Sequence, residues 1–334
     1  MQVFLPVRCR KHRPAGIISD VRLSPDSELC VANLGGEATI MRIWVLGSGT
    51  PTPSLRRMCS GYLVQLGSST ICFDHGFGAH HRLLELGVRA TQVTHLFLTH
   101  LHYDHIGDYP RLLLTRWDQG GGKVPELKVF GPPPLAQITE RLFAEDGAFG
   151  PDLRARTRDQ CSLDLYQARG GVGGRKRPAP VVTELGPSDT VRDDGFEVSV
   201  APVSHFAPYL TSYAYRLTHE GRSLVYSGDT GPTESLVRLA GSCDVLIHMC
   251  HYLSGTAPSE EFARSCTGHL ELARMARDAG VKTLVLTHIT EQIDRPGIRE
   301  RVISEIAEVF KGDILFGSDL LEVPVVGAAA GKLD

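Results

Sequence analysis

The stretch Leu98-Thr99-His100-Leu101-His102-Tyr103-Asp104-His105-Ile106-Gly107-Asp108 places three histidines and an aspartate within six residues. It continues the run Val93-Thr94-His95-Leu96-Phe97-Leu98, which is typical of a buried β-strand that leads into a loop. A strand end is rigid, and the loop after it lets alternate side chains converge on one point. Imidazole and carboxylate groups together suit divalent metals such as Zn²⁺. The alternative is a histidine-rich loop, but four such groups exceed the three protein ligands of one catalytic zinc ion and favour two neighbouring ions.

Four other segments stand in a fixed order around this stretch. They are Leu46-Gly47-Ser48-Gly49-Thr50-Pro51, Val203-Ser204-His205, Ser227-Gly228-Asp229-Thr230 and Leu286-Thr287-His288. Each of the last three follows an apolar run that predicts a strand, so their polar side chains also stand at strand ends. Taken together, the five segments resemble the metallo-β-lactamase superfamily, specifically its ribonuclease Z-like branch. The resemblance covers about residues 41 to 325.

The resemblance implies a ligand set. One ion would be held by His100, His102 and His205, the other by Asp104, His105 and His288, and Asp229 would bridge both. Two divalent ions about 4 Å apart lower the pKa of a bridging water, supply hydroxide and clamp a developing oxyanion. Asp104 would also orient that hydroxide. Zinc is the expected metal, with manganese or iron as alternatives, whereas a lone histidine or aspartate at these positions would more often be structural.

Several further positions are candidates outside this ligand set. Asp74 ends a predicted strand and is expected to accept a hydrogen bond from a ligand histidine, with a turn as the alternative role. His269 resembles the family histidine near the leaving group, which implies a general acid or a phosphate-stabilising donor; the alternative is a locally bonded histidine at a helix start. Met249 replaces the glutamate that many relatives carry, so we assign no acid there. His248 and His251 are left as pocket-lining candidates.

Composition limits the class of protein. The chain has 334 residues, 42% hydrophobic and 22% charged, which are ordinary globular values. A net charge of −3 gives no global electrostatic reason to expect nucleic acid. The eight scattered cysteines predict buried thiols in a reducing compartment rather than a disulfide framework. We find no run of membrane-spanning length and no signal peptide, and therefore expect a cytoplasmic protein with no membrane partner.

Strand and helix patterns recur in two comparable halves. Strands are predicted at 41–46, 61–66, 69–74, 93–98 and 127–132, and again at 196–200, 212–217, 223–227, 243–248, 282–287 and within 313–325. Helices are predicted at 79–86, 106–117, from 133 to about 144, at 269–279 and at 295–310. Sheets covered by helices on their outer faces are the economical arrangement, and the resemblance implies the same αββα sandwich.

The predicted domain boundaries follow from these patterns. Residues 1–40 are expected to be an N-terminal extension, 41–325 the hydrolase domain, and 326–334 a C-terminal tail. Within the domain, residues 145–180 look irregular and basic and include the glycine-rich loop 170–178. This segment is either a solvated loop or a lid that offers positive charge to an anionic substrate.

The expected function is that of a dinuclear metal-dependent hydrolase acting on a small phosphodiester or related ester. Alternatives are an arylsulfate, lactone or amide hydrolase with the same site, an iron-dependent oxidative enzyme, and a non-catalytic nucleic-acid-binding member of the fold. Transfer-RNA-processing members of the branch carry an RNA-gripping arm between the third histidine motif and the bridging aspartate. The short interval between His205 and Asp229 leaves no room for such an arm. We therefore expect a small-molecule ester as partner, no nucleic acid, and allow for a homodimer.

Overall fold

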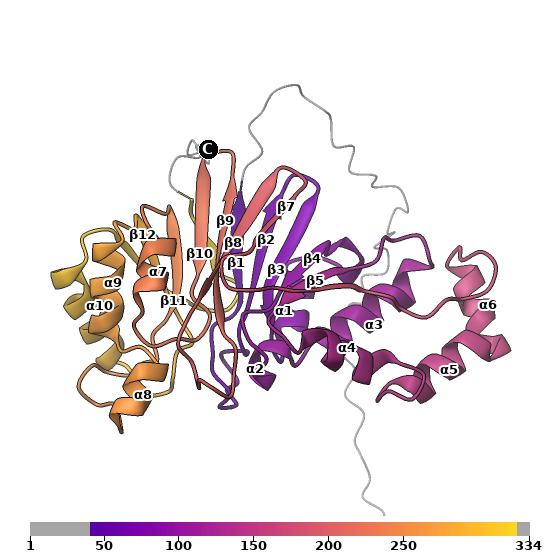
Figure 1. Cartoon of the computed structure of the whole chain (residues 1–334), viewed down its shortest axis with the longest axis horizontal. Helices are drawn as coiled ribbons and strands as arrows, with labels where there is room; N and C mark the ends of the chain where they lie inside the picture. Colours follow the sequence, from indigo (N-terminus) through magenta and orange to yellow (C-terminus); the bar gives the residue numbers. More distant parts are fainter. Residues whose placement is uncertain (1–40, 326–334) are drawn as a thin grey trace, which may run out of the picture. The chain divides into compact units, whose positions relative to one another are not determined.

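Two seven-stranded sheets carry the part of the chain that the computed structural model describes, residues 41–325 (Figure 1). The expectations for 1–40 and 326–334 lie outside these residues. In spatial order, the first sheet consists of β14 (Glu322–Val323), β1 (Arg42–Gly47), β2 (Gly61–Leu66), β3 (Ser69–His75), β4 (His95–Phe97), β5 (Lys128–Gly131) and β6 (Val181–Glu184). The second consists of β13 (Asp313–Phe316), β12 (Thr283–Thr287), β11 (Val245–Met249), β10 (Arg222–Tyr226), β9 (Tyr213–His219), β8 (Phe196–Pro202) and β7 (Thr190–Asp193).

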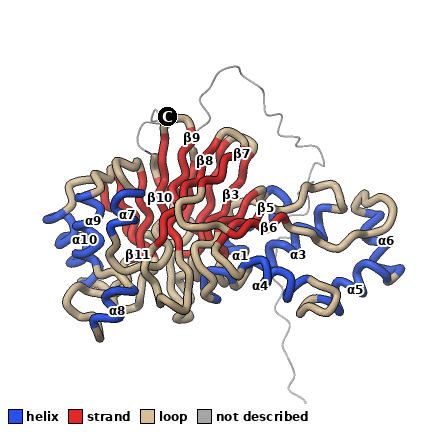
Figure 2. The backbone as a smooth tube through the Cα atoms, in the orientation of Figure 1, coloured by secondary structure: helices blue, strands red, loops and turns tan. Residues whose placement is uncertain are grey.

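Helices cover the outer face of each sheet (Figure 2). On the first sheet lie α1 (Ala79–Glu85), the one-turn helix α2 (Tyr103–Ile106), α3 (Tyr109–Gly120) and α4 (Leu135–Phe143), with a 3₁₀ turn at Ala90–Gln92. The second sheet carries α7 (Glu234–Leu239), α9 (His269–Asp278) and α10 (Ile298–Val309), and α8 (Glu260–Ser265) precedes α9. The predicted αββα sandwich is confirmed.

Strand alternation builds three apolar layers. In β1, Ile43 and Val45 pack between the sheets, whereas Trp44 and Leu46 pack under the helices of the first sheet. The middle layer joins side chains from both sheets, because successive residues of a strand point to opposite faces. Such a layer holds the ends of the two sheets at a fixed separation, and the residues discussed below lie at those ends.

Parallel pairing brings the important loops together. β3 to β6 are parallel in the first sheet, and β10 to β13 are parallel in the second. The carboxyl ends of parallel strands meet at one edge of a sheet, where α/β folds usually bind ligands. The loops after β3, β4, β10 and β12 therefore leave from the same edges.

The expectation of an irregular segment at 145–180 is wrong. It contains two helices, α5 (Gly150–Arg158) and α6 (Gln160–Ala168). The residues of these helices are mostly charged or exposed, and Leu153 and Tyr166 are their only large buried side chains. With so few buried positions the apolar period that would have predicted a helix does not form. A lid role for this segment stays a prediction.

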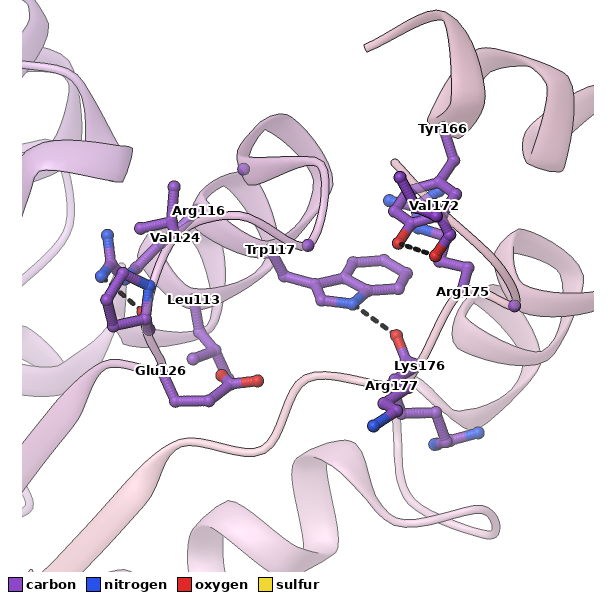
Figure 3. A pocket seen from close by; sticks show the side chains of 14 residues that line it. Leu113, Arg116, Trp117, Val124, Glu126, Tyr166, Val172, Arg175, Lys176 and Arg177 are labelled. Carbon is purple, nitrogen blue, oxygen red and sulfur yellow. Dashed lines mark hydrogen bonds between the residues drawn. The ribbon is translucent and has the colours of Figure 1, made fainter. Parts of the chain in front are cut away.

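The arginines of this segment anchor it to the body of the domain. Asp118, on α3, accepts hydrogen bonds from Arg156 (3.0 Å), Arg169 (2.6 Å) and Arg175 (2.7 Å). The Arg175 guanidinium also lies 3.9 Å from the centre of the Trp117 ring, a favourable cation–π contact. Trp117 and Arg175 line a cavity of about 320 Å³, which Figure 3 shows from close by. None of the seven predicted metal ligands lines it.

Two further expectations concern the described residues as a group. No helix within residues 41–325 is long and apolar enough to cross a membrane. The six cysteines in this range are free thiols, and four of them are buried: Cys72, Cys243, Cys250 and Cys266.

Candidate metal centre

The seven predicted ligands all stand at or just after strand ends. His100 follows β4, His102 is the N-cap of α2, and Asp104 and His105 lie within that short helix. From the second sheet, His205 follows β8, Asp229 follows β10 and His288 comes directly after β12. The structure brings these side chains into two adjacent groups, His100–His102–His205 and Asp104–His105–Asp229–His288. Each group takes side chains from both sheets.

The backbone around the groups is tight. Gly228 has φ +57°, and a Cβ atom added there would lie 2.8 Å from the Cβ atom of Thr99. Only glycine combines that conformation with so close an approach. His288 (φ 53°) and Asp74 (φ 52°) also occupy the left-handed region, which costs non-glycine residues free energy. Such strained positions concentrate at functional sites, and here one carries a predicted ligand and the other the carboxylate that bonds to His105.

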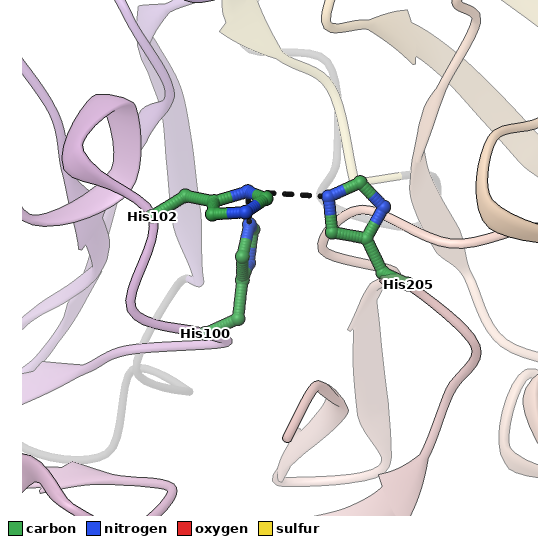
Figure 4. A group of neighbouring side chains, drawn as sticks. All are labelled: His100, His102 and His205. Atoms are coloured by element: carbon green, nitrogen blue, oxygen red, sulfur yellow. Dashed lines mark hydrogen bonds between the residues drawn. The ribbon is translucent and has the colours of Figure 1, made fainter. Parts of the chain in front are cut away.

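Three imidazole nitrogens converge in the first group (Figure 4). His102 Nδ1 lies 3.2 Å from His100 Nε2 and 3.2 Å from His205 Nε2. Ligands 2.0–2.1 Å from a tetrahedral zinc ion are about 3.3 Å apart, so this spacing matches three corners of such a site. Three ring nitrogens directed at one point cannot all form hydrogen bonds with one another.

The remaining ring nitrogens fix the orientation of this group. His205 Nδ1 donates to the carbonyl oxygen of Ser265 at 2.7 Å, which leaves its Nε2 as a lone-pair donor. His100 Nδ1 donates to Thr99 Oγ1 at 2.9 Å, with the same result. Burial lowers the pKa of His100, His102 and His205, and a neutral imidazole is the form that binds a metal.

The second group is built around Asp229. Its Oδ2 atom lies 3.1 Å from His288 Nε2, 3.5 Å from His105 Nε2 and 3.7 Å from His205 Nε2 of the first group. Asp104 Oδ2 lies 3.4 Å from His105 Nε2 and 3.5 Å from His288 Nε2. Except for the 3.1 Å between Asp229 and His288, these separations exceed the roughly 2.7–3.2 Å of good hydrogen bonds and suit atoms that share an ion. Asp229 stands between the two groups.

Unpartnered buried atoms test whether these residues fit a cation. Both carboxylate oxygens of Asp104, His105 Nε2 and His288 Nε2 are buried without a hydrogen-bond partner. A buried polar atom left unpaired costs roughly 1–3 kcal/mol, and four at one point need an explanation. Histidine nitrogen and aspartate oxygen are ligands that zinc, manganese and iron accept. The donor set therefore fits divalent cations.

The charges of the second group agree with that fit. Burial would lower the pKa of His288, but the carboxylates of Asp229 and Asp104 raise that pKa to about 9. Burial likewise opposes protonation of His105, yet Asp229 and Asp74 hold its pKa well above its usual value. The two imidazoliums in turn keep the pKa of Asp104 and of Asp229 low against the effect of burial. Without a cation, two protons supply the charge that a divalent ion would bring, and metal binding would displace them.

Asp74 accepts a hydrogen bond from the predicted ligand His105, as expected from the sequence. Its Oδ2 atom accepts hydrogen bonds from His105 Nδ1 (2.7 Å), Tyr226 OH (2.8 Å) and Thr99 Oγ1 (2.8 Å), and its Oδ1 atom accepts one from the Thr99 backbone N–H (2.8 Å). Because Thr99 Oγ1 also accepts from His100, Asp74 orients one histidine of each group. The sequence identified Asp74 but gave no sign of Tyr226 or Thr99.

His269 lies outside both groups. Its Nδ1 atom accepts from the Ser254 backbone N–H at 3.0 Å, and its Nε2 atom lies 2.6 Å from Glu305 Oε2. No sequence signal pointed to Glu305, which comes from the distant helix α10. His251 is the nearer of the pocket-lining candidates: its Nδ1 atom lies 3.0 Å from Nδ1 of His288, whereas His248 is buried in β11. The catalytic role of His269 stays a prediction.

Known proteins resemble this chain over most of its length. The family model described as the metallo-beta-lactamase superfamily matches residues 55–288. A ribonuclease Z of Mycobacterium sp. (strain KMS) is 33% identical over 292 residues, which cover 86% of this chain and 96% of that protein. A ribonuclease Z of Mycobacterium bovis (strain BCG / Pasteur 1173P2) is 32% identical over 293 residues, 86% of this chain and 99% of the relative.

Solved structures share the fold. YhfI from Bacillus subtilis, a metallo-beta-lactamase fold protein, superposes with a TM-score of 0.65 at 20% identity and covers 85% of this chain and 98% of its own. The short form of human tRNase Z superposes with a TM-score of 0.61 at 20% identity, over 85% of this chain and 99% of its own. At 20% identity, the similarity to these structures shows that the fold is shared and nothing more.

The comparisons correct one expectation and identify the family. The expectation of a small-molecule ester as partner and of no nucleic acid is wrong, because the curated relatives are ribonucleases. That expectation relied on the missing arm between His205 and Asp229 and on net charge. Net charge averages over the whole surface and does not report local phosphate contacts. With a family model matched from 55 to 288 and relatives above 30% identity over nearly their whole length, the chain belongs to the metallo-β-lactamase superfamily and, within it, to the ribonuclease Z-like branch of metal-dependent hydrolases.

Proposed function

We propose that this protein hydrolyses phosphodiester bonds in RNA at the two adjacent groups of buried ligands. The observation that carries the proposal is the convergence of seven histidine and aspartate side chains, four of whose atoms are buried without a hydrogen-bond partner. Ribonuclease Z relatives at 33% identity support a phosphodiester as the reacting group. RNA is the substrate class that these relatives have in common.

Two divalent ions, with zinc as the proposed metal, would be held by the first group and by Asp104, His105 and His288, and Asp229 would be shared between them. When bound, such ions activate a water and stabilise negative charge on a phosphate oxygen. The chain itself supplies orientation: the Asp74 network holds His100 and His105, and Ser265 holds His205. The free Oδ1 atom of Asp104 is an acceptor for a proton of the attacking water.

The RNA contacts must differ from those of members with a gripping arm. Between His205 and Asp229 the chain forms β9 and β10, which pair through a tight turn at Glu220 and Gly221. These strands belong to the second sheet, so this interval carries no protruding arm. Other exposed surfaces near the two groups must therefore bind the nucleotides beside the reacting phosphate.

The test uses the full chain loaded with zinc, manganese or iron and a panel of bis(p-nitrophenyl) phosphate, a precursor transfer RNA with a 3′ trailer, and sulfate, lactone and amide substrates. We expect hydrolysis of both phosphodiesters, lost in His205→Ala and on chelation. His81→Ala is the matched control, because the His81 side chain is 63% exposed on α1 and lies outside both groups. Hydrolysis confined to the sulfate, lactone or amide, or full RNA cleavage by His205→Ala, would overturn the proposal.

A further inference from the structure

Exposed aromatic side chains lie beside the first ligand group, which consists of His100, His102 and His205. Phe77 (50% exposed), Tyr103 (58%), Phe206 (51%) and Tyr209 (95%) are the aromatic members of the large apolar side chains exposed within residues 41–325. We call these four residues the aromatic rim. Tyr103 adjoins the predicted ligands His102 and Asp104, and Phe206 adjoins His205. Exposed apolar rings so close to a reaction centre point to a ligand that covers them.

Phe206 forms one side of the rim. Its ring centre lies 4.6 Å from that of His205 and 5.4 Å from that of His102, in edge-to-face contacts. The residue has φ 47°, a left-handed conformation that is rare and costly for a bulky side chain. The Tyr209 backbone N–H donates to the Phe206 carbonyl oxygen at 3.1 Å and closes the turn that presents both rings. This strained turn holds an aromatic face at the edge of the first ligand group.

Phe77 and Tyr103 form the other side. Their ring centres lie 6.1 Å apart with planes inclined by 48°. Phe77 rests on Gly107, where an added Cβ atom would lie 2.7 Å from its ring. Tyr103 is the first residue of α2, between His102 at the N-cap and Asp104. The four rings thus form two pairs, one attached to the α2 segment and one to the loop after β8.

We infer that the aromatic rim stacks unpaired nucleobases on the nucleotides that flank the reacting phosphodiester. The inference rests on the proposed function, because it takes the ligand groups as the place where the phosphate binds. A dinucleotide carries one base on each side of its phosphate, and the rim likewise carries one pair of rings at the α2 segment and another in the loop after β8. Stacking on aromatic side chains tolerates every base, since each has a π-face. A base inside a stem is already stacked and cannot use the rim, so unpaired flanking nucleotides are preferred.

The first experiment measures binding of two fluorescein-labelled probes by anisotropy, using the metal-loaded full chain. One probe is a 12-nucleotide oligoadenylate, and the other is an abasic ribose-phosphate oligomer of the same length and charge; both carry phosphorothioate linkages to suppress cleavage. We expect Tyr209→Ala and Tyr103→Ala each to weaken binding of oligoadenylate by roughly 5- to 150-fold and to leave binding of the abasic oligomer unchanged. Tyr209→Phe and Tyr103→Phe, which keep the ring, should bind as the wild type does.

Controls separate the rim from the metal centre and from general surface effects. Leu165→Ala removes an apolar side chain that is 46% exposed on α6, outside the rim, and should change neither Kd. Metal content, measured by elemental analysis, reports the two ligand groups and should be the same in both tyrosine variants as in the wild type, because neither tyrosine belongs to those groups. Phe206→Leu keeps an apolar side chain without a π-face, and we expect it to lose oligoadenylate affinity as well.

Three results would overturn the inference. One is oligoadenylate binding unchanged in both alanine variants while the wild type still cleaves RNA, which refutes the rim and leaves the proposed function standing. Another is an equal loss of affinity for the base-bearing and abasic probes in the alanine variants, which would show that the rim contacts the sugar-phosphate backbone of the RNA and not its bases. The third is a shift of oligomeric state in sedimentation with no change in either Kd, which would show that a second copy covers these rings. Failure of the wild type to hydrolyse any phosphodiester would refute the proposed function, and the probe comparison would still test stacking.

Discussion

Asp74 shows how much one carboxylate can organise. It accepts four hydrogen bonds, two of them from the Thr99 backbone N–H and Tyr226 OH, and through His105 and Thr99 it reaches both ligand groups. Its left-handed backbone conformation turns the carboxylate toward them. Outer hydrogen bonds of this kind fix the ring orientation of a metal-binding histidine and raise its basicity.

Replacing Asp74 by alanine should therefore weaken metal binding. We expect a 10- to 100-fold loss of affinity, because His105 would lose the partner that orients its ring. Competition against a chromophoric chelator measures the affinity. Asp244→Ala is a suitable control, since Asp244 is also buried but bonds to Lys282 and Ser223 away from both groups. Similar metal affinity in the two variants would show that Asp74 contributes only to stability.

His269 makes a sharper test of chemistry. If it serves the leaving group, His269→Ala should reduce turnover by roughly 10²–10⁴ and leave the metal content intact. The loss should shrink for substrates whose leaving groups need no proton. Because both ring nitrogens are already bonded to Ser254 and Glu305, the alternative outcome is an equal loss for all leaving groups, which would make its role structural.

At the residue scale, what could be predicted depended on sequence neighbours. His100, Asp229 and His288 each follow an apolar strand, so their convergence could be anticipated. Phe206 follows such a ligand too, but nothing in its identity reveals a strained and exposed ring. Glu305 meets His269 only because α10 folds back against α9, a contact that no local pattern records.

At the scale of elements, buried strands were predictable and exposed ones were not. β2 was expected at 61–66 and occupies Gly61–Leu66, because its apolar run is buried on both faces. β6 was missed: it is an edge strand whose four residues are half-buried or exposed, so no alternation marks it. Helices α5 and α6 were not predicted for the same reason. They bury few apolar side chains, and hydrogen bonds from arginines to Asp118 hold this segment instead.

One ion pair joins elements that are far apart in the sequence. Arg57 donates two hydrogen bonds to Asp294, and both side chains are 9% exposed. The same guanidinium donates to Ser48 Oγ and to the Gly317 carbonyl oxygen, each at 2.6 Å. It thereby ties the turn after β1 to the segments that precede α10 and follow β13.

Asp294→Ala should reduce the free energy of unfolding at pH 7 by about 3 kcal/mol, because it leaves a nearly buried guanidinium uncompensated. Hydrogen bonds from Arg57 lower the pKa of the Asp294 carboxyl below its usual 3.8. Its contribution is therefore complete above the unfolded-state pKa and is lost as the pH falls through the lower folded-state pKa. Urea unfolding at several pH values should show the difference from the wild type narrowing only below about pH 4.

Glu322→Ala is the matched control for this pair. Glu322 pairs with Arg42 at the surface, with side chains 50% and 52% exposed, and such a pair contributes at most about 1 kcal/mol. A loss in Asp294→Ala no larger than that of Glu322→Ala would contradict the assignment of Arg57 as a tie between elements.

At the scale of the whole molecule, the ligand groups join the two sheets. Four predicted ligands come from the first sheet and three from the second, so bound cations would stabilise the association of the sheets. Ions that bind only the folded chain, present at about 100 times their Kd, add roughly 2.7 kcal/mol of stability. Removing them with a chelator should lower Tm by about 5 °C, as measured by calorimetry. His205→Ala serves as the metal-deficient reference. If chelation left the Tm of the metal-loaded wild type unchanged, ligation by both sheets would be contradicted.

The division of ligands between sheets has a further consequence for how the chain could be cut. The backbone passes from the first sheet to the second between β6 and β7 and returns between β13 and β14. A break at 185–189 would separate His100, His102, Asp104 and His105 from His205, Asp229 and His288, and neither piece would own a complete cation site. Two co-expressed pieces would then act as a conditional enzyme, in which zinc assembles the halves and β14 of one piece docks beside β1 of the other.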